Sequence, residues 1–153
     1  MKFPFSLLVS SASGADDSGT GRGVAHGDFN GDGLLDLFVV NMGSRDGETG
    51  TSRLYVNASE NDNNWLSIVL QGTESNRFGI GARLAVTAGG IRQIREMGAS
   101  QSHTSNSVVP VHFGLGDADA ADSVEINWPS GRTQRLENVP VNQELTVVEP
   151  TGT

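Results

Sequence analysis

The sequence predicts an all-β fold, an antiparallel β-sandwich preceded by a β-hairpin. Apolar and polar residues alternate in many short segments along the 153-residue chain, which is the pattern of half-buried strands. Turn-forming residues separate these segments at nearly regular spacing, and this is typical of a sandwich or barrel. Apolar residues at helical spacing are scarce, so we expect helix to be nearly absent.

The first two strand-like segments lie in the N-terminal part of the chain. Residues 34–41 read LLDLFVVN, an apolar run rich in β-formers, and residues 52–57 read SRLYVN, with apolar residues at alternate positions. Two or three short strands are too few to bury a core. This part of the chain must therefore dock on another surface.

Seven further segments follow, and together they are sufficient for a sandwich core. They are residues 65–71, 82–88, 90–97, 107–113, 123–128, 132–136 and 144–149. Gly89-Gly90 predicts a tight turn between the second and third of these segments. Pro129-Ser130-Gly131 predicts another turn, between the fifth and sixth.

The composition of the chain changes near residue 60. Glycine, aspartate and asparagine dominate before it, and the polar run SENDNN at residues 59–64 leads into a steadier pattern of strands and turns. We therefore predict two units. The first, residues 1–63, carries the hairpin, and the second, residues 64–153, forms the sandwich.

The charge balance narrows the class of partner. Eighteen acidic residues against ten basic ones give a formal net charge of −8, which disfavours binding to nucleic acid or to an anionic membrane surface. Cations are the natural small partners of such a chain. The absence of cysteine excludes disulfides and thiolate metal sites, and no segment has the roughly 20 apolar residues that membrane insertion requires.

One loop concentrates oxygen-bearing side chains. Residues 27–41 read GDFNGDGLLDLFVVN, with carboxylates and a carboxamide at alternate positions and a glycine, Gly33, at the sixth position of the loop. This arrangement suits a hard cation of the size of Ca²⁺, because the glycine permits the sharp turn that folds the oxygens inward. The predicted ligands are Asp28, Asn30, Asp32, the backbone carbonyl of Leu34, and Asp36.

The loop departs from an EF-hand at its end. The twelfth position, where an EF-hand carries a bidentate glutamate, is Val39, and the chain enters a strand instead of a helix. Asp36 must therefore close the site, and a hairpin must present it. The alternative is a solvated acidic turn, since Asn-Gly and Asp-Gly are common hairpin residues, but carboxylates that converge without a cation repel one another.

The pattern DxNxDGxxD running into LFVVN resembles the calcium-binding loop of the FG-GAP (VCBS) repeat, the blade unit of integrin-type β-propellers. The flanking stretches GTGRGVAHGDFNGDG and SRLYVNAS resemble the same repeat. From Asn64 onward, SNRFGIGAR and VEINWPSG resemble the ASPIC and UnbV domain. That domain directly follows the last FG-GAP repeat at the C-terminus of cartilage acidic protein-like bacterial proteins.

The resemblance covers roughly residues 9–149 and implies half a propeller blade followed by a sandwich. It also implies that the chain binds Ca²⁺ and is extracellular or periplasmic. Residues 1–15 keep two interpretations. They have the outline of a secretory signal, with one lysine, a short apolar run and small residues. In the other interpretation, residues 9–23 align with the ordinary approach to the repeat, and the run from Phe3 to Val9 is the stump of a strand.

The leading hypothesis is a non-enzymatic, calcium-binding extracytoplasmic β-module for adhesion or assembly, with a protein or carbohydrate partner. We expect it to be a C-terminal portion of a larger architecture. We also predict a homodimer, because LDLFVVN is apolar on both faces and little of this chain is available to cover it. The alternative is that the half-blade folds onto the sandwich of residues 65–149 of the same chain. The rival hypothesis is a calcium-dependent hydrolase acting on esters or lactones. Its nearest base in the sequence is His26, and no catalytic residue is assigned.

Four aromatic side chains outside the loop have structural interpretations. We expect Trp65 and Trp128, which begin and end strands, to anchor the core, with a ligand-stacking role as the alternative. His112 lies in a strand and should pack or hydrogen-bond there. His103 lies in the serine-rich stretch ASQSHTSNS, where no GxSxG pattern supports serine catalysis.

Overall fold

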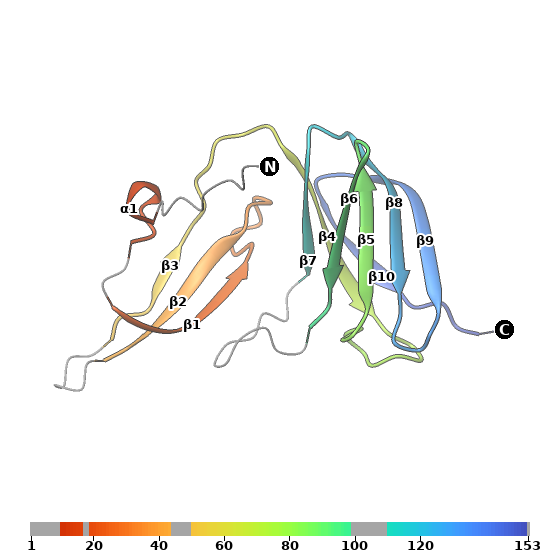
Figure 1. The fold of residues 1–153 in the computed structure, drawn as a ribbon, viewed down its shortest axis with the longest axis horizontal. Helices are drawn as coiled ribbons and strands as arrows, with labels where there is room; N and C mark the ends of the chain where they lie inside the picture. Colours follow the sequence, from red (N-terminus) through yellow and green to blue (C-terminus); the bar gives the residue numbers. More distant parts are fainter. Residues whose placement is uncertain (1–9, 17–18, 44–49, 99–109, 153) are drawn as a thin grey trace, which may run out of the picture.

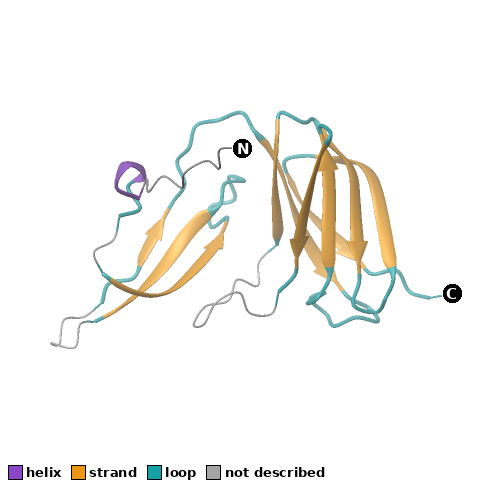
Figure 2. Cartoon of the chain, viewed as in Figure 1, coloured by secondary structure: helices purple, strands orange, loops and turns teal. Residues whose placement is uncertain are grey.

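The computed structural model describes residues 10–16, 19–43, 50–98 and 110–152 of the chain. These residues form three sheets in which nearly all neighbouring strands run antiparallel, and this confirms the predicted all-β class (Figure 1, Figure 2). One sheet holds the N-terminal strands and stands beside a sandwich made of the other two. The helical content of the described residues is one short helix, α1 (Ser10–Ser13).

The N-terminal sheet is a three-stranded antiparallel meander. It contains β1 (Thr20–Gly27), β2 (Asp36–Met42) and β3 (Arg53–Tyr55), in that spatial order. The predicted segments at 34–41 and 52–57 correspond to β2 and β3. The central strand, β2, is the apolar run of the sequence.

Strand β1 was not among the predicted strands. Its sequence, TGRGVAHG, contains three glycines and lacks the alternation that marks a strand. Pairing with β2 provides its hydrogen bonds, with Thr20 opposite Met42 and Gly27 opposite Asp36. Residues 28–35 therefore form the loop that joins the two strands.

The sandwich packs a three-stranded sheet, ordered β10-β4-β7, against a four-stranded sheet, ordered β6-β5-β8-β9. Its strands are β4 (Asn64–Gln71), β5 (Arg83–Ala88), β6 (Ile91–Glu96), β7 (Val111–Gly116), β8 (Ala120–Asn127), β9 (Thr133–Pro140) and β10 (Gln143–Val148). Each of the seven predicted segments supplies one of these strands. Part of the segment predicted at 107–113 lies outside the described residues.

One strand pair differs from the antiparallel expectation. Strand β10 runs parallel to β4, with Gln143 opposite Leu66 and Val148 opposite Gln71. Alternation predicts that a segment is a strand, but it carries no information on the direction of the partner strand. The last strand of the sandwich thus pairs with its first.

The core lies between the two sheets of the sandwich. Its fully buried side chains include Leu66, Ile68, Leu84, Val86, Phe113, Val124 and Ile126. Trp128 belongs to this core, as predicted, and its indole N–H donates to Gln134 Oε1 at 3.1 Å. The expectation for Trp65 was wrong. Leu66 and Ile68 point inward, so strand alternation places Trp65 on the outer face of the same sheet.

Both predicted turns are present. Residues 89–90 join β5 to β6, and both glycines have positive φ, at 54° and 76°, as a two-residue hairpin turn requires. Residues 129–131 join β8 to β9, and the N–H of Gly131 donates to the carbonyl of Trp128 at 2.9 Å.

The N-terminal sheet exposes apolar side chains on both of its faces. Those that are at least one third exposed include Val24, Leu37, Phe38, Val40, Met42 and Leu54. Along β2, the side chains of Phe38 and Val40 lie on one face of the sheet, and the side chain of Leu37 lies on the opposite face. Neither face is covered within the described residues to the extent of the sandwich core.

In the described part of the chain, we find no helix with the length and apolar character needed to cross a membrane.

Candidate metal centre

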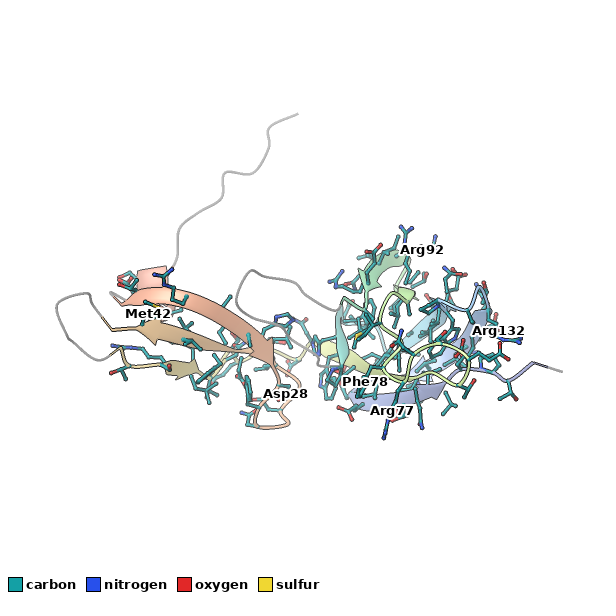
Figure 3. The ribbon with its side chains drawn as sticks, turned by 90° about the horizontal axis from the view of Figure 1, so that it is seen from below. Asp28, Met42, Arg77, Phe78, Arg92 and Arg132 are labelled. Carbon is teal, nitrogen blue, oxygen red and sulfur yellow. The ribbon has the colours of Figure 1, made fainter. Side chains whose placement is uncertain are left out.

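The predicted metal loop connects β1 to β2, at the end of the sheet that faces the sandwich (Figure 3). The hairpin places the first ligand, Asp28, immediately after β1, and the last ligand, Asp36, at the first position of β2. The loop is thus presented by a hairpin, as the sequence requires. Its side chains differ in exposure: Asn30 and Asp32 are exposed, whereas Asp36 is 1% exposed.

The carboxylate of Asp28 organises the backbone of the loop. Its Oδ1 accepts the N–H groups of Gly31 at 2.7 Å and Asp32 at 3.1 Å. Its Oδ2 accepts the N–H of Gly33 at 2.8 Å. Three successive backbone donors therefore turn around one side chain, and this fixes the turn on which the next two ligands are mounted.

Asn30 and Asp32 are joined to each other on that turn. The Asn30 amide donates to Asp32 Oδ2 at 2.7 Å, and Asn30 Oδ1 accepts the N–H of Asp32 at 3.2 Å. Asp32 Oδ1 accepts the N–H of Leu34 at 2.8 Å. The structure thus brings together the side chains of Asp28, Asn30 and Asp32. Leu34 follows them directly, through its backbone.

Asp36 holds the base of the loop and connects it to the end of β3. Its Oδ2 accepts the N–H of Phe29 at 2.9 Å, and its Oδ1 accepts the N–H of Asn57 at 2.7 Å. The Asn57 amide in turn donates to the carbonyl of Leu35 at 3.3 Å. Asn57 was not singled out from the sequence, although the stretch that contains it, SRLYVN, was associated with the repeat.

The chemical type of the predicted ligands suits a hard cation. Every side chain offered is a carboxylate or an amide oxygen, which are the ligands that Ca²⁺ takes. A carboxylate has about four lone-pair sites, so Asp28 with three hydrogen bonds and Asp36 with two both retain acceptor capacity. Within the described residues, no group of three or more His, Cys, Asp or Glu side chains is close enough to hold a metal as placed. Asp28, Asp32 and Asp36 all accept backbone N–H groups, and Asp36 is the buried member of the three.

Gly33, the sixth residue of the loop, contacts the sandwich. It is buried, unlike its neighbours Gly31 and Asp32, and its φ is +86°. A Cβ built on Gly33 would overlap the pyrrole ring of Trp65. Two features therefore require glycine at this position: the sharp turn of the backbone and the close approach of the indole. The sharp turn was predicted from the sequence, but the close approach to an indole from another sheet was not.

Trp65 is part of a row of polar and aromatic side chains on the outer face of β4 and β7. Its ring stacks on His112, with centroids 5.8 Å apart and planes 16° from parallel. His112 Nδ1 is 2.9 Å from the hydroxyl of Ser67. Burial lowers the pKa of His112, and the nearby Asp28 carboxylate opposes this shift. The prediction that His112 packs and hydrogen-bonds in its strand is confirmed.

Three clefts surround the contact between the loop and the sandwich, and Trp65 lines all of them. One of about 430 Å³ includes His26 and Arg95, and one of about 440 Å³ includes Asp28 and Glu144. A third, of about 410 Å³, runs beside the polar residues that precede β4. His26, the base considered for a hydrolase, therefore lines a cleft beside the loop, whereas His103 lies outside the described residues.

A second buried carboxylate, Glu149, was missed by the sequence analysis. It follows β10, is 1% exposed, and its Oε2 accepts the N–H groups of Thr73, Glu74 and Ser75 at 2.7 to 2.9 Å. Its Oε1 accepts the hydroxyls of Ser75 at 2.7 Å and Ser130 at 2.5 Å. The only sequence signal was an acid directly after an apolar strand.

These contacts of Glu149 join three loops that are far apart in the chain. The β4–β5 loop supplies the three backbone donors, the β8–β9 turn supplies Ser130, and Glu149 itself follows β10. On the surface beside this cluster, Arg132 makes a two-pronged ion pair with Glu74, at 2.8 and 3.0 Å. The conspicuous stretches SNRFGIGAR and VEINWPSG thus each supply a donor to this structural cluster, Ser75 from the first and Ser130 from the second.

The chain is similar to known families and proteins along most of its length. The family described as ASPIC and UnbV matches residues 72–153, more than half of the chain, and the FG-GAP repeat matches residues 20–56. Cartilage acidic protein 1 of Xenopus tropicalis is 29% identical over 96% of this chain, and that of Homo sapiens is 30% identical over 88%. The chain spans about a fifth of the length of these relatives. The boundary predicted between residues 63 and 64 falls between the two matched regions and remains a prediction.

Proposed function

This chain belongs to the ASPIC and UnbV family, preceded by an FG-GAP repeat, and on that premise we propose that it is a calcium-binding extracytoplasmic β-module for adhesion or assembly. The observation that carries the proposal is the loop between β1 and β2. Its turn is already shaped by the Asp28 carboxylate, and it gathers oxygen donors without a basic residue among them.

The residues that would hold the ion are Asp28, Asn30, Asp32, the carbonyl of Leu34, and Asp36. Bound Ca²⁺ would neutralise the carboxylates that otherwise repel across the turn. The same carboxylates organise the loop backbone and connect it to β3, so they would carry the effect of the ion into the sheet. We therefore propose a stabilising role for the ion.

An extracellular or periplasmic location fits this role. Extracellular calcium modules work with dissociation constants of about 10⁻⁴ to 10⁻³ M, which a single exposed loop can reach. The absence of cysteine is compatible with an oxidising compartment. The name of the relatives, cartilage acidic protein 1, associates those proteins with cartilage.

Adhesion or assembly is supported by the exposed apolar sheet. Phe38 and Leu37 lie on opposite faces of β2 and are 37% and 40% exposed. Such surfaces in extracellular modules are covered by a protein or carbohydrate partner or by another copy. We propose a second copy of this chain, because a two-fold axis can cover the same face of both copies at once.

The test of the calcium site is a titration of the whole chain with Ca²⁺, followed by calorimetry and by thermal unfolding. At a hundredfold excess over the dissociation constant, binding to the native state alone stabilises it by about 2.7 kcal/mol. Asp32→Ala should abolish both the binding heat and the stabilisation. The exposed carboxylate Asp119, outside the loop, provides the matched control Asp119→Ala, which should behave like the unchanged chain. Identical unfolding in calcium and in chelator would refute the site.

A further inference from the structure

We propose that Trp65 is a positioning residue for the metal loop. Through this indole, the sandwich would supply the surface on which the sixth residue of the loop rests. The loop would then be completed by the next unit of the chain. This inference rests on the proposed calcium function and adds a residue from outside the repeat to the determinants of that site.

The contact itself is close and specific. Gly33 is the buried residue of an otherwise exposed turn, and the space that its Cβ would occupy is taken by Nε1, Cδ1 and Cε2 of Trp65. Its φ of +86° is already disfavoured for other residues. The turn and the indole therefore fit together only with glycine at this position.

Gly33 also connects the indole to the first predicted ligand. Its N–H donates to Asp28 Oδ2 at 2.8 Å, while its Cα side faces Trp65. One residue thus lies between the ring and a carboxylate of the site. If the ring is removed, Gly33 loses its support, and the hydrogen bond that orients Asp28 can shift with it.

Trp65 is held firmly enough to act as a support. Asn142 pairs with its backbone on both sides: the N–H of Asn142 donates to the Trp65 carbonyl at 2.6 Å, and the N–H of Trp65 donates to Asn142 Oδ1 at 3.1 Å. The ring stacks on His112, which is in turn fixed by Ser67. Residues of the sandwich thus hold both the backbone and the ring of Trp65.

Trp65 is the residue that the clefts around the metal loop have in common. Three clefts of about 410 to 440 Å³ border the loop, and the indole is the residue that lines all three. Figure 3 shows Asp28 in the part of the repeat nearest the sandwich, consistent with a narrow joint.

The experiment measures Ca²⁺ affinity by calorimetry on the full chain and on Trp65→Ala, Trp65→Phe and the control Phe78→Ala. Phe78 is an aromatic residue of the sandwich, 54% exposed, that does not line the three clefts. Loss of an outer support of this kind weakens metal binding by about 10-fold or more. We expect that loss for Trp65→Ala, a smaller one for Trp65→Phe, and none for Phe78→Ala.

Tryptophan emission reports whether the contact between the indole and the loop responds to the ion. The chain has two tryptophans, and Trp128 is buried in the core. Adding Ca²⁺ should therefore change the emission of the unchanged chain and leave that of Trp65→Phe constant. If Trp65→Ala does not fold, the role of Trp65 is tested by the emission change of the unchanged chain and by the Ca²⁺ affinity of Trp65→Phe.

The outcomes separate the two proposals. Wild-type affinity in folded Trp65→Ala, or in Trp65→Phe together with no emission change in the parent chain, overturns the role of Trp65 and leaves the calcium site intact. A parent chain that produces no calcium-binding heat refutes the proposed function itself, and the role of Trp65 with it.

Discussion

At the scale of single residues, the buried carboxylate of Glu149 has the most direct physical consequence. Burial alone would raise the pKa of Glu149, but hydrogen bonds from Ser130, Ser75 and Thr73 outweigh it and lower the pKa to about 2 from an ordinary value of 4.5. The native state therefore strongly favours the ionised form. Protonation of Glu149 would place a hydrogen on a carboxylate whose neighbouring backbone N–H and hydroxyl groups all donate to it.

This shift makes the stability of the sandwich depend on acid. Because the folded pKa of Glu149 lies below the unfolded one, its contribution is fully present above about pH 4.5 and is lost as the pH falls toward 2. Glu149→Gln should lower the urea midpoint at pH 7, since one terminal atom of the amide becomes a donor facing donors. The difference from the parent chain should shrink toward pH 2.

The matched control for this series is Glu144→Gln, which changes an exposed carboxylate of the neighbouring strand, β10. Its urea midpoint should follow that of the parent chain at every pH. If Glu149→Gln lost as much stability at pH 2 as at pH 7, the side-chain volume, and not the charge, would account for its effect.

Residue roles that depend on distant partners were the ones that the sequence could not predict. Asp28, Asn30 and Asp32 were identified because their spacing within one turn is itself the signal. Trp65 and Glu149 have partners that lie far away in the chain, Gly33 and Thr73–Ser75, so their surroundings follow from the fold. Alternation identified the strand of Trp65 but left the face of the sheet undecided.

At the scale of elements, the β5–β6 hairpin depends on its turn. Gly90 has a φ of 76°, and no neighbouring atom lies within 4 Å of the position that a Cβ would occupy, so backbone conformation alone penalises a side chain there. Gly90→Ala should cost about 1 to 2 kcal/mol in the free energy of unfolding. Chemical denaturation would measure this cost.

The control for the hairpin is Gly114→Ala in β7. This glycine also has open space around it, but its φ is not in the left-handed region. Its replacement should be neutral or slightly stabilising, because alanine restricts the unfolded chain. Equal losses for Gly90→Ala and Gly114→Ala would show that the turn conformation is not what requires glycine.

Most elements of the fold could be predicted, and the exceptions have identifiable causes. The apolar runs of β4, β5 and β8 are strongly patterned because one or both faces are buried. In β1, glycines occupy positions where apolar residues would have revealed the alternation of a strand. Pairing with β2 imposes its extended conformation. The sequence pattern also could not predict which strands pair with each other, as the parallel pair of β10 and β4 demonstrates.

At the scale of the whole molecule, the exposed N-terminal sheet determines the expected assembly. We expect the chain to sediment as a dimer, and Phe38→Asp to convert it to monomer or to insoluble protein. A charge placed on an apolar face opposes its burial against a second copy. Analytical ultracentrifugation at several concentrations measures the outcome.

The control for assembly is Ile91→Asp on the sandwich, where the parent side chain is 67% exposed. This variant should sediment like the parent chain. A parent chain that is monomeric at high micromolar concentration would contradict the dimer. The covering surface of the sheet would then have to come from another part of a longer protein or from an unrelated partner.

The pairing of the last strand with the first has a consequence for synthesis on the ribosome. Gln143 of β10 lies opposite Leu66 of β4, so the three-stranded sheet stays incomplete until almost the whole domain has been translated. Glu149 adds to this delay, since the β4–β5 loop lacks its acceptor until the residues after β10 emerge. A chain whose synthesis stops before residue 143 therefore has an unclosed sandwich, which is open to proteolysis and to the chaperones that recognise exposed strands.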